Sequence, residues 1–108
     1  MSLTQKTCVP CQGGIPPLTP EEAGTFMDQV PGWELSDSSD RIRKKFTFED
    51  FVASLDFVNK VGAIAEEEGH HPDISFGWGY ADITVFTHKI QGLHENDFIL
   101  AAKINALV

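Results

Sequence analysis

The chain has 108 residues, the size of a single domain, with 42% hydrophobic residues, a formal charge of −8 and a pI near 4.7. Its basic residues form no stripe for a phosphate backbone, so we expect no nucleic-acid partner. No run reaches the roughly 18 apolar residues of a membrane span. The first residues also lack the apolar core of a secretory signal, so we expect a cytoplasmic location and no membrane association.

Residues 1–17 are rich in Gly and Pro and show no hydrophobic period, which predicts a flexible leader before a single domain at residues 18–108. Cys8 and Cys11 form a Cys-x-x-Cys pair in this leader. A tetrahedral metal site needs four ligands, and a thioredoxin-like motif should follow a strand and open a helix. A non-catalytic role is therefore favoured, with a redox or shared metal site as the alternative.

The stretch LTPEEAGTFMDQVPG predicts the first helix. Thr19 is its N-cap, Pro20 suits the first helical position and Glu22 completes a capping box. The segments GWEL and RIRKKFTF follow and flank the polar turn SDSSD, so they predict a β-hairpin.

A second helix is predicted to start near Thr47 and to end at Gly69, a residue suited to the left-handed conformation that follows many helices. Apolar and small residues at helical spacing predict its buried stripe: Phe51, Leu55, Val58, Gly62 and Ala65.

DISF and YADITVFTH, joined by GWG, predict a second hairpin. GLHENDFILAAKINALV predicts a third helix, with His94 at its N-cap and Asp97 three residues later. The order α-β-β-α-β-β-α predicts an α+β domain, in which three helices cover one face of a four-stranded antiparallel sheet.

Three of the four histidines lie near the ends of these elements. His70 and His71 follow the second helix in EEEGHHPDI, and His88 ends the last predicted strand. If that strand pairs with DISF through the GWG turn, all three imidazoles lie at the open end of the hairpin. Imidazole gives and takes protons near neutral pH, so the cluster predicts acid–base catalysis.

Two carboxylates could orient or charge-stabilise these rings: Glu66, one turn before His70, and Asp97. Helix capping and solvation are the alternative for both. A mononuclear zinc or iron site is the rival interpretation of the cluster. The H-E-x-x-H spacing is absent, however, and adjacent histidines would have to point the same way, so we expect no metal.

The combination of E-x-x-x-H-H-P, a strand pair ending in T-H, and G-L-x-x-x-D resembles the pterin-4a-carbinolamine dehydratase (4a-hydroxytetrahydrobiopterin dehydratase) family. The likeness runs from LTPEEA through AAKI and includes GW at 32–33 and F-x-F-x-x-F at 46–51. It implies the same fold and a homodimer or homotetramer. It also implies dehydration of a small-molecule 4a-hydroxytetrahydropterin to quinonoid dihydropterin, without a cofactor. The implied functional partner is an aromatic amino acid hydroxylase, which produces that substrate.

The resemblance also implies roles for individual residues. His70 and His88 match the acid/base pair, and His71 matches the histidine that holds and orients the pterin. Glu66 matches the carboxylate that supports the histidines, and Asp97 matches the acid near the site. Trp33 matches an aromatic residue beside the pterin, and packing under the sheet is the alternative role for it.

The sequence departs from some family members at two positions. Gly69 replaces an acidic residue and Ile90 replaces a cysteine. Neither change removes a proton-transfer group, so we interpret both as tuning the pocket. The leader resembles prokaryotic members, which favours a bacterial cytoplasm. The alternative function is a non-catalytic assembly factor or transcriptional coactivator that reuses the fold, but the retained histidines favour catalysis.

Overall fold

The computed structural model describes residues 3–8 and 15–108. The α-helices in these residues are α1 (Pro20–Met27), α2 (Phe51–Glu68) and α3 (Glu95–Asn105), and two 3₁₀ turns are η1 (Leu3–Gln5) and η2 (His88–Ile90). The strands are β1 (Glu34–Leu35), β2 (Ile42–Thr47), β3 (Asp73–Gly77) and β4 (Tyr80–Val85).

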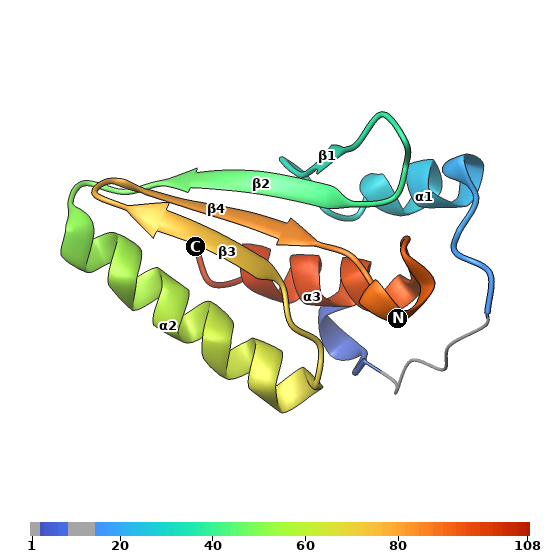
Figure 1. The fold of residues 1–108 in the computed structure, drawn as a ribbon. Helices are drawn as coiled ribbons and strands as arrows, with labels where there is room; N and C mark the ends of the chain where they lie inside the picture. The colour runs from blue at the N-terminus through green and yellow to red at the C-terminus, as the bar shows by residue number, and fades with distance from the viewer. Residues whose placement is uncertain (1–2, 9–14) are drawn as a thin grey trace.

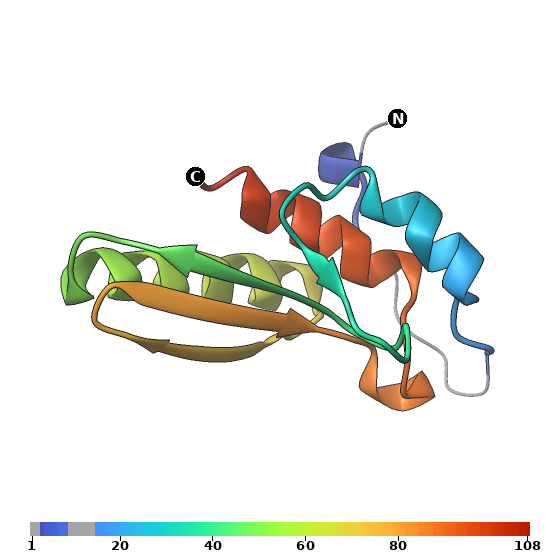
Figure 2. The ribbon, with the colours of Figure 1, turned by 90° about the horizontal axis from the view of Figure 1, so that it is seen from above.

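The strands form one antiparallel sheet in the order β1-β2-β4-β3. The helices lie on one face of this sheet, and α2 runs beneath β3 and β4 (Figures 1 and 2). The predicted α+β class and element order are therefore confirmed. Because β3 pairs antiparallel with β4, the start of β3 and the end of β4 meet at one end of the sheet, with Asp73 opposite Thr84.

Local sequence signals set several helix ends as predicted. The backbone N–H of Glu22 donates to Thr19 Oγ1 at 3.2 Å, and the N–H of Thr19 donates to Glu22 Oε1 at 2.9 Å. These bonds form the expected capping box before α1. Gly69 ends α2 with φ of +65°, the left-handed conformation that glycine adopts without a steric cost.

The start and the buried face of α2 differ from the prediction. Thr47 still pairs with Tyr80 in the sheet, and the helix begins at Phe51 after Asp50, whose side chain accepts from the N–H of Ala53 at 2.8 Å. The buried residues of α2 are Ser54, Phe57, Val61 and Ala65, whereas Phe51 and Leu55 are exposed.

Aromatic packing explains the different buried face of α2. The ring of Phe57 contacts those of Phe46 and Phe48, at centroid distances of 4.6 and 5.0 Å. Packing against β2 therefore decides which stripe of this apolar helix faces the core.

The last strand is shorter than expected. Ala81, Ile83 and Val85 are buried in the core, but β4 ends at Val85 and His88 begins η2. Thr87 forms a bridge with Gly92, so the chain turns away from the sheet at this point. The turn places Thr87 in the interior and His88 at the surface.

Residues 3–8 of the predicted leader lie against the folded domain. Leu3 is 3% exposed and belongs to the hydrophobic core, and η1 contacts α3. Lys6 forms an ion pair with Glu95 at 2.6 Å. The Gly/Pro content gave no indication of these contacts. Cys11 lies outside the described residues.

Across the part of the chain that the structure describes, no helix has both the length and the hydropathy that a membrane crossing requires.

Candidate active site

The site is built around a buried pair formed by His70 and Asp97. Nε2 of His70 lies 2.5 Å from Oδ1 of Asp97, and the two side chains are 12% and 0% exposed. His70 follows the C-terminal end of α2, and Asp97 lies in the first turn of α3. The pair therefore joins the ends of two helices that are distant in sequence.

Asp97 also binds two further donors through its second oxygen. The hydroxyl of Thr87 donates to Oδ2 at 2.9 Å, and the backbone N–H of His94 donates to the same atom at 2.9 Å. The capping role considered for Asp97 is therefore present together with its contact to His70. A carboxylate held in this way orients the imidazole on its other side.

The contact with Asp97 determines which nitrogen of His70 is available for chemistry. Asp97 accepts hydrogen bonds, so the proton between the two groups belongs to Nε2 of His70. Nδ1 has no hydrogen-bond partner among the described residues. This second nitrogen can therefore take a proton as a neutral ring or give one as a charged ring.

His71 forms a similar pair in a different environment. Its Nε2 contacts Oε2 of Glu66, and the side chains are 61% and 78% exposed. The two neighbouring histidines thus each have a carboxylate partner, one in the interior and one at the surface. Glu66 was predicted to support the histidines, and the histidine that it contacts in the structure is His71.

His88 lies one residue beyond Thr87, and its ring packs against Phe86 with centroids 4.2 Å apart. The guanidinium of Arg41 lies over the same Phe86 ring, 4.8 Å from its centre. A surface hollow of about 380 Å³ is lined by Asp40, Arg41, Phe86, His88 and Gln91.

His70 and His71 precede the first residue of β3, and His88 follows the last residue of β4, so along the chain all three lie near the end of the sheet where β3 begins and β4 ends. His88 is connected to the His70–Asp97 pair indirectly: Thr87, the residue before it in the chain, donates a hydrogen bond to Asp97. Within the described residues, no hydrogen bond or ring contact joins the His88 ring to His70 or His71.

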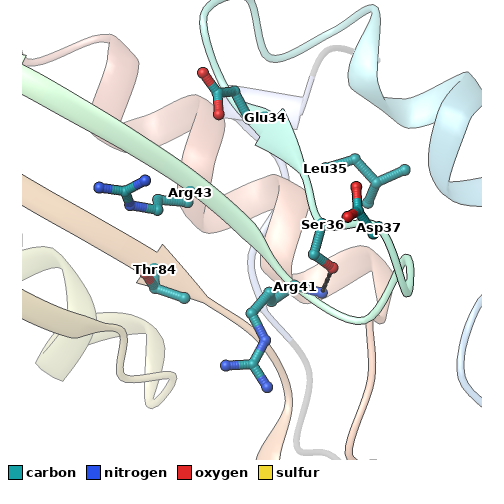
Figure 3. Close-up of a pocket in the computed structure, with 7 residues that line it drawn as sticks. All are labelled: Glu34, Leu35, Ser36, Asp37, Arg41, Arg43 and Thr84. Atoms are coloured by element: carbon teal, nitrogen blue, oxygen red, sulfur yellow. Dashed lines mark hydrogen bonds between the residues drawn. The ribbon is translucent and has the colours of Figure 1, made fainter.

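A second hollow, of about 480 Å³, shares Arg41 with the first (Figure 3). It is lined by Glu34, Leu35, Ser36, Asp37, Arg41, Arg43 and Thr84. Ser36 accepts from the N–H of Arg41 at 3.2 Å, which fixes the turn between β1 and β2. Arg43 is paired with Asp82, and this contact lowers the pKa of that carboxyl. The hollow therefore presents both charge signs.

Trp33 packs against the opposite end of α3 from Asp97. It is 5% exposed, its Nε1 donates to Oδ1 of Asn105 at 2.9 Å, and its ring meets Phe46 edge-on. Asn105 ends α3, whereas Asp97 lies near its start. These contacts are those of the packing role considered for Trp33.

Two further residues lie near Asp97, one with a role that the sequence predicted and one with a role that it did not. His94 is the N-cap of α3, as predicted, and its Nδ1 accepts from the N–H of Asn96 at 3.1 Å. No role was predicted for Thr87 from the sequence. A buried hydroxyl needs a partner, and a threonine directly before a candidate catalytic histidine was the signal for its contact with Asp97.

No group of three or more His, Cys, Asp or Glu side chains within residues 3–8 and 15–108 is arranged to hold a metal ion. The chemistry that the described residues can support is proton transfer, by the carboxylate-oriented imidazoles of His70 and His71 and by His88, which lines the surface hollow.

Comparison with known proteins identifies the family. Residues 16–107 match the model of the pterin 4 alpha carbinolamine dehydratase family. A protein of Methylococcus capsulatus named "Putative pterin-4-alpha-carbinolamine dehydratase" is 58% identical over 98% of this chain and 93% of its own length. A relative of the same name from Rubrobacter xylanophilus is 57% identical over 97% of each chain.

Two solved structures share the fold. One is a transcriptional coactivator/pterin dehydratase from Brucella melitensis, with a TM-score of 0.80 and 31% identity over 84% of this chain and 97% of that chain. The other is a pterin dehydratase-like protein described as a RuBisCO assembly factor in the alpha-carboxysome, with a TM-score of 0.61 and 28% identity over 70% and 88%. The match to the family model and the identity of its relatives show that this chain belongs to the pterin 4 alpha carbinolamine dehydratase family.

Proposed function

We propose that this protein removes water from a 4a-hydroxytetrahydropterin to give quinonoid dihydropterin, with histidines as the acid and base. The observation that carries the proposal is the buried contact between His70 and Asp97, which leaves Nδ1 of His70 for proton transfer. Family membership supplies the substrate class.

The reaction requires two proton transfers. A proton must reach the 4a-hydroxyl as the C–O bond breaks, because hydroxide is a poor leaving group. The proton on N5 must leave as the C4a=N5 bond forms, so that one water is lost in total. His70 and His88 are the proposed acid/base pair, and exposed His71, held by Glu66, orients the pterin. Proton transfer accounts for the whole reaction, so the proposal names no cofactor.

The test is stopped-flow absorbance with chemically prepared 4a-hydroxytetrahydropterin. We expect the wild type to accelerate dehydration, and His70→Ala and His88→Ala each to reduce the rate by about 10²-fold or more. His94→Asn is the matched control, because asparagine also caps a helix and the third helix should stay intact. A wild-type rate in the His70→Ala/His88→Ala double variant would refute these roles.

The two adjoining hollows suggest how a pterin lies. We propose that the ring occupies the hollow beside His88 and that its side chain extends past Arg41 into the second hollow. Two carboxylates and two guanidinium groups together suit a neutral, hydroxylated side chain better than an anion. Asp37→Asn should then raise the KM of the biopterin substrate and not that of the 6-methyl analogue, in the same stopped-flow assay.

A homodimer or homotetramer is also part of the proposal. Large apolar side chains are exposed on α2 and in the turn after β3: Phe51, Val52, Leu55 and Trp78. Such side chains favour burial against another chain. Sedimentation of the wild type should show an oligomer, and Leu55→Asp should shift it toward the monomer.

Two proposals concern the biological setting. A hydroxylase that forms 4a-hydroxytetrahydropterin is the proposed functional partner, and the bacterial cytoplasm is the proposed location. The alternative function is an assembly or coactivator role, which the names of the two structural relatives favour. An oligomer that does not accelerate dehydration would favour this alternative.

A further inference from the structure

The described part of the leader contacts the junction between α2 and α3. The backbone N–H of Cys8 donates to Oε1 of Glu68 at 2.7 Å, and its thiol donates to the carbonyl oxygen of Asn96 at 3.6 Å. Glu68 is the last residue of α2, and Asn96 lies in the first turn of α3. Cys8 therefore bridges the end of one helix and the start of the next.

A second contact joins the same two helices. Nζ of Lys103 on α3 donates to Oε2 of Glu68 at 2.7 Å, and the side chains are 19% and 5% exposed. The pKa of Glu68 is lowered, first by this bond and then by the N–H of Cys8. Both oxygens of a largely buried carboxylate are thus used, one by the leader and one by α3.

The state of the Cys8 side chain agrees with a structural role. Burial, followed by the nearby carboxylate of Glu68, raises the pKa of the Cys8 thiol to about 12. The thiol therefore keeps its proton at neutral pH and can donate it to the carbonyl of Asn96. A protonated, buried thiol is a poor nucleophile, so this residue does not resemble a catalytic cysteine.

These contacts lie directly beside the His70–Asp97 pair. Glu68 precedes His70 by two residues, and Asn96 precedes Asp97 by one. Any displacement of the end of α2 relative to the start of α3 would therefore lengthen the 2.5 Å contact between the two side chains.

We infer that Cys8, Glu68 and Lys103 form a clamp that positions His70 against Asp97. All three are positioning residues, which act on catalysis only through that pair. The effect on catalysis rests on the proposed dehydratase function. The existence of the clamp does not, so the two can be tested separately.

The catalytic test compares variants that break the clamp with variants that conserve it. Lys103→Met removes the bond from α3 to Glu68, and Cys8→Ala removes the thiol bond to Asn96 but keeps the backbone bond to Glu68. Each should lower kcat by about tenfold and change KM by less than about twofold, because the pair is misplaced while the substrate hollow is intact. Lys103→Arg and Cys8→Ser, which keep a donor, should recover most of the rate. Lys6→Met is the matched control: it removes another leader contact, the half-buried Lys6–Glu95 ion pair, and should leave kcat unchanged.

A second readout needs no substrate. The proton on Nε2 of His70 can be followed by NMR, and its exchange with water should be about tenfold faster in Lys103→Met and Cys8→Ala than in the wild type and Lys6→Met. Circular dichroism checks that each variant is folded. Should Lys103→Met prove unfolded, Cys8→Ala decides, since it deletes only a sulfur atom.

The outcomes separate the two proposals. Faster proton exchange in the clamp variants, with no dehydration by the wild type, supports the clamp and refutes the dehydratase assignment. Dehydration by the wild type, with unchanged kcat and proton exchange in folded clamp variants, overturns the clamp alone. A fall in kcat that Lys6→Met reproduces would also overturn it, because the effect would then belong to the leader as a whole.

Discussion

The two histidine–carboxylate pairs of this protein have the same chemical groups and opposite environments. His70 and Asp97 are 12% and 0% exposed, whereas the adjacent His71 and its partner Glu66 are 61% and 78% exposed. In water the attraction between two charges is weak and is screened by salt, and in the interior it is much stronger. Neighbouring residues can therefore differ greatly in how firmly they are held.

The partners of each carboxylate increase this contrast. Asp97 also accepts from Thr87 and His94, so its position is fixed by three donors. In the described residues, the carboxylate of Glu66 accepts from no donor other than His71. The comparison indicates that the buried pair provides a fixed proton-transfer group and the exposed pair an adaptable contact for the substrate.

The comparison predicts its largest effect at Asp97. Asp97→Ala should lower the free energy of unfolding by about 3–5 kcal/mol, because it leaves buried partners without their acceptor. It should also lower the dehydration rate by about 10²-fold or more, since His70 loses its orientation. Urea unfolding and stopped-flow kinetics measure the two effects, with Glu95→Gln as a neighbouring control. A stability loss below about 1 kcal/mol would contradict a buried, fully used carboxylate.

The second largest effect is expected at Glu68, and its size should depend on pH. Its pKa is lowered by the bonds from Lys103 and Cys8, so its contribution to stability is present above the pKa of the unfolded chain and is lost as the pH falls through the folded pKa. Glu68→Gln should therefore cost about 1.5–3 kcal/mol at pH 7, and less as the pH is lowered into the acid range.

The measurement is urea unfolding of the wild type and Glu68→Gln at several pH values. Glu67→Gln, next in the chain and exposed, should match the wild type throughout. A stability difference that does not change between neutral and acid pH would show that the charge of Glu68 is irrelevant to its role.

The sequence predicted those features of the fold that depend on contacts between residues close together in the chain, and it failed for features that depend on tertiary contacts. The cap of α1 follows from Thr19 and Glu22, which lie within four residues, and the sequence predicted it. The buried stripe of α2 depends on the position of Phe57 against Phe46, a tertiary contact. The prediction was wrong for Phe51 and Leu55, although Ala65 is buried as predicted. An apolar helix offers more than one possible stripe, so its partner decides.

The candidate site shows the same difference between what the chain sequence reveals and what only the tertiary structure reveals. The sequence singled out His70, Asp97 and Glu66, because residue types and spacing reveal candidate acids and bases. It did not pair Glu66 with His71 or connect Cys8 to the end of α2, since these contacts depend on how chain segments cross in space. The catalytic roles themselves stay predictions.

Thr87, two residues after the last strand, supports Asp97, and removal of its hydroxyl should have an intermediate effect. Thr87→Val keeps the branched shape and removes the hydroxyl that donates to Oδ2 of Asp97. We expect a loss of about 1–2 kcal/mol in unfolding free energy and a fall in kcat of severalfold. Thr47→Val, at an exposed position of β2, is the control. Equal effects of the two substitutions would show that the hydroxyl of Thr87 contributes nothing specific.

The smallest effect is expected at the exposed pair. Glu66→Gln should change the free energy of unfolding by less than about 1 kcal/mol, and that change should shrink further in 1 M salt, because exposed ion pairs are weak and screened. If His71 orients the substrate, the same substitution should raise KM more than it lowers kcat. A fall in kcat as large as that of Asp97→Ala would instead mean that Glu66 and His71 form the proton-transfer pair, and the roles assigned to the buried and exposed histidines would have to be exchanged.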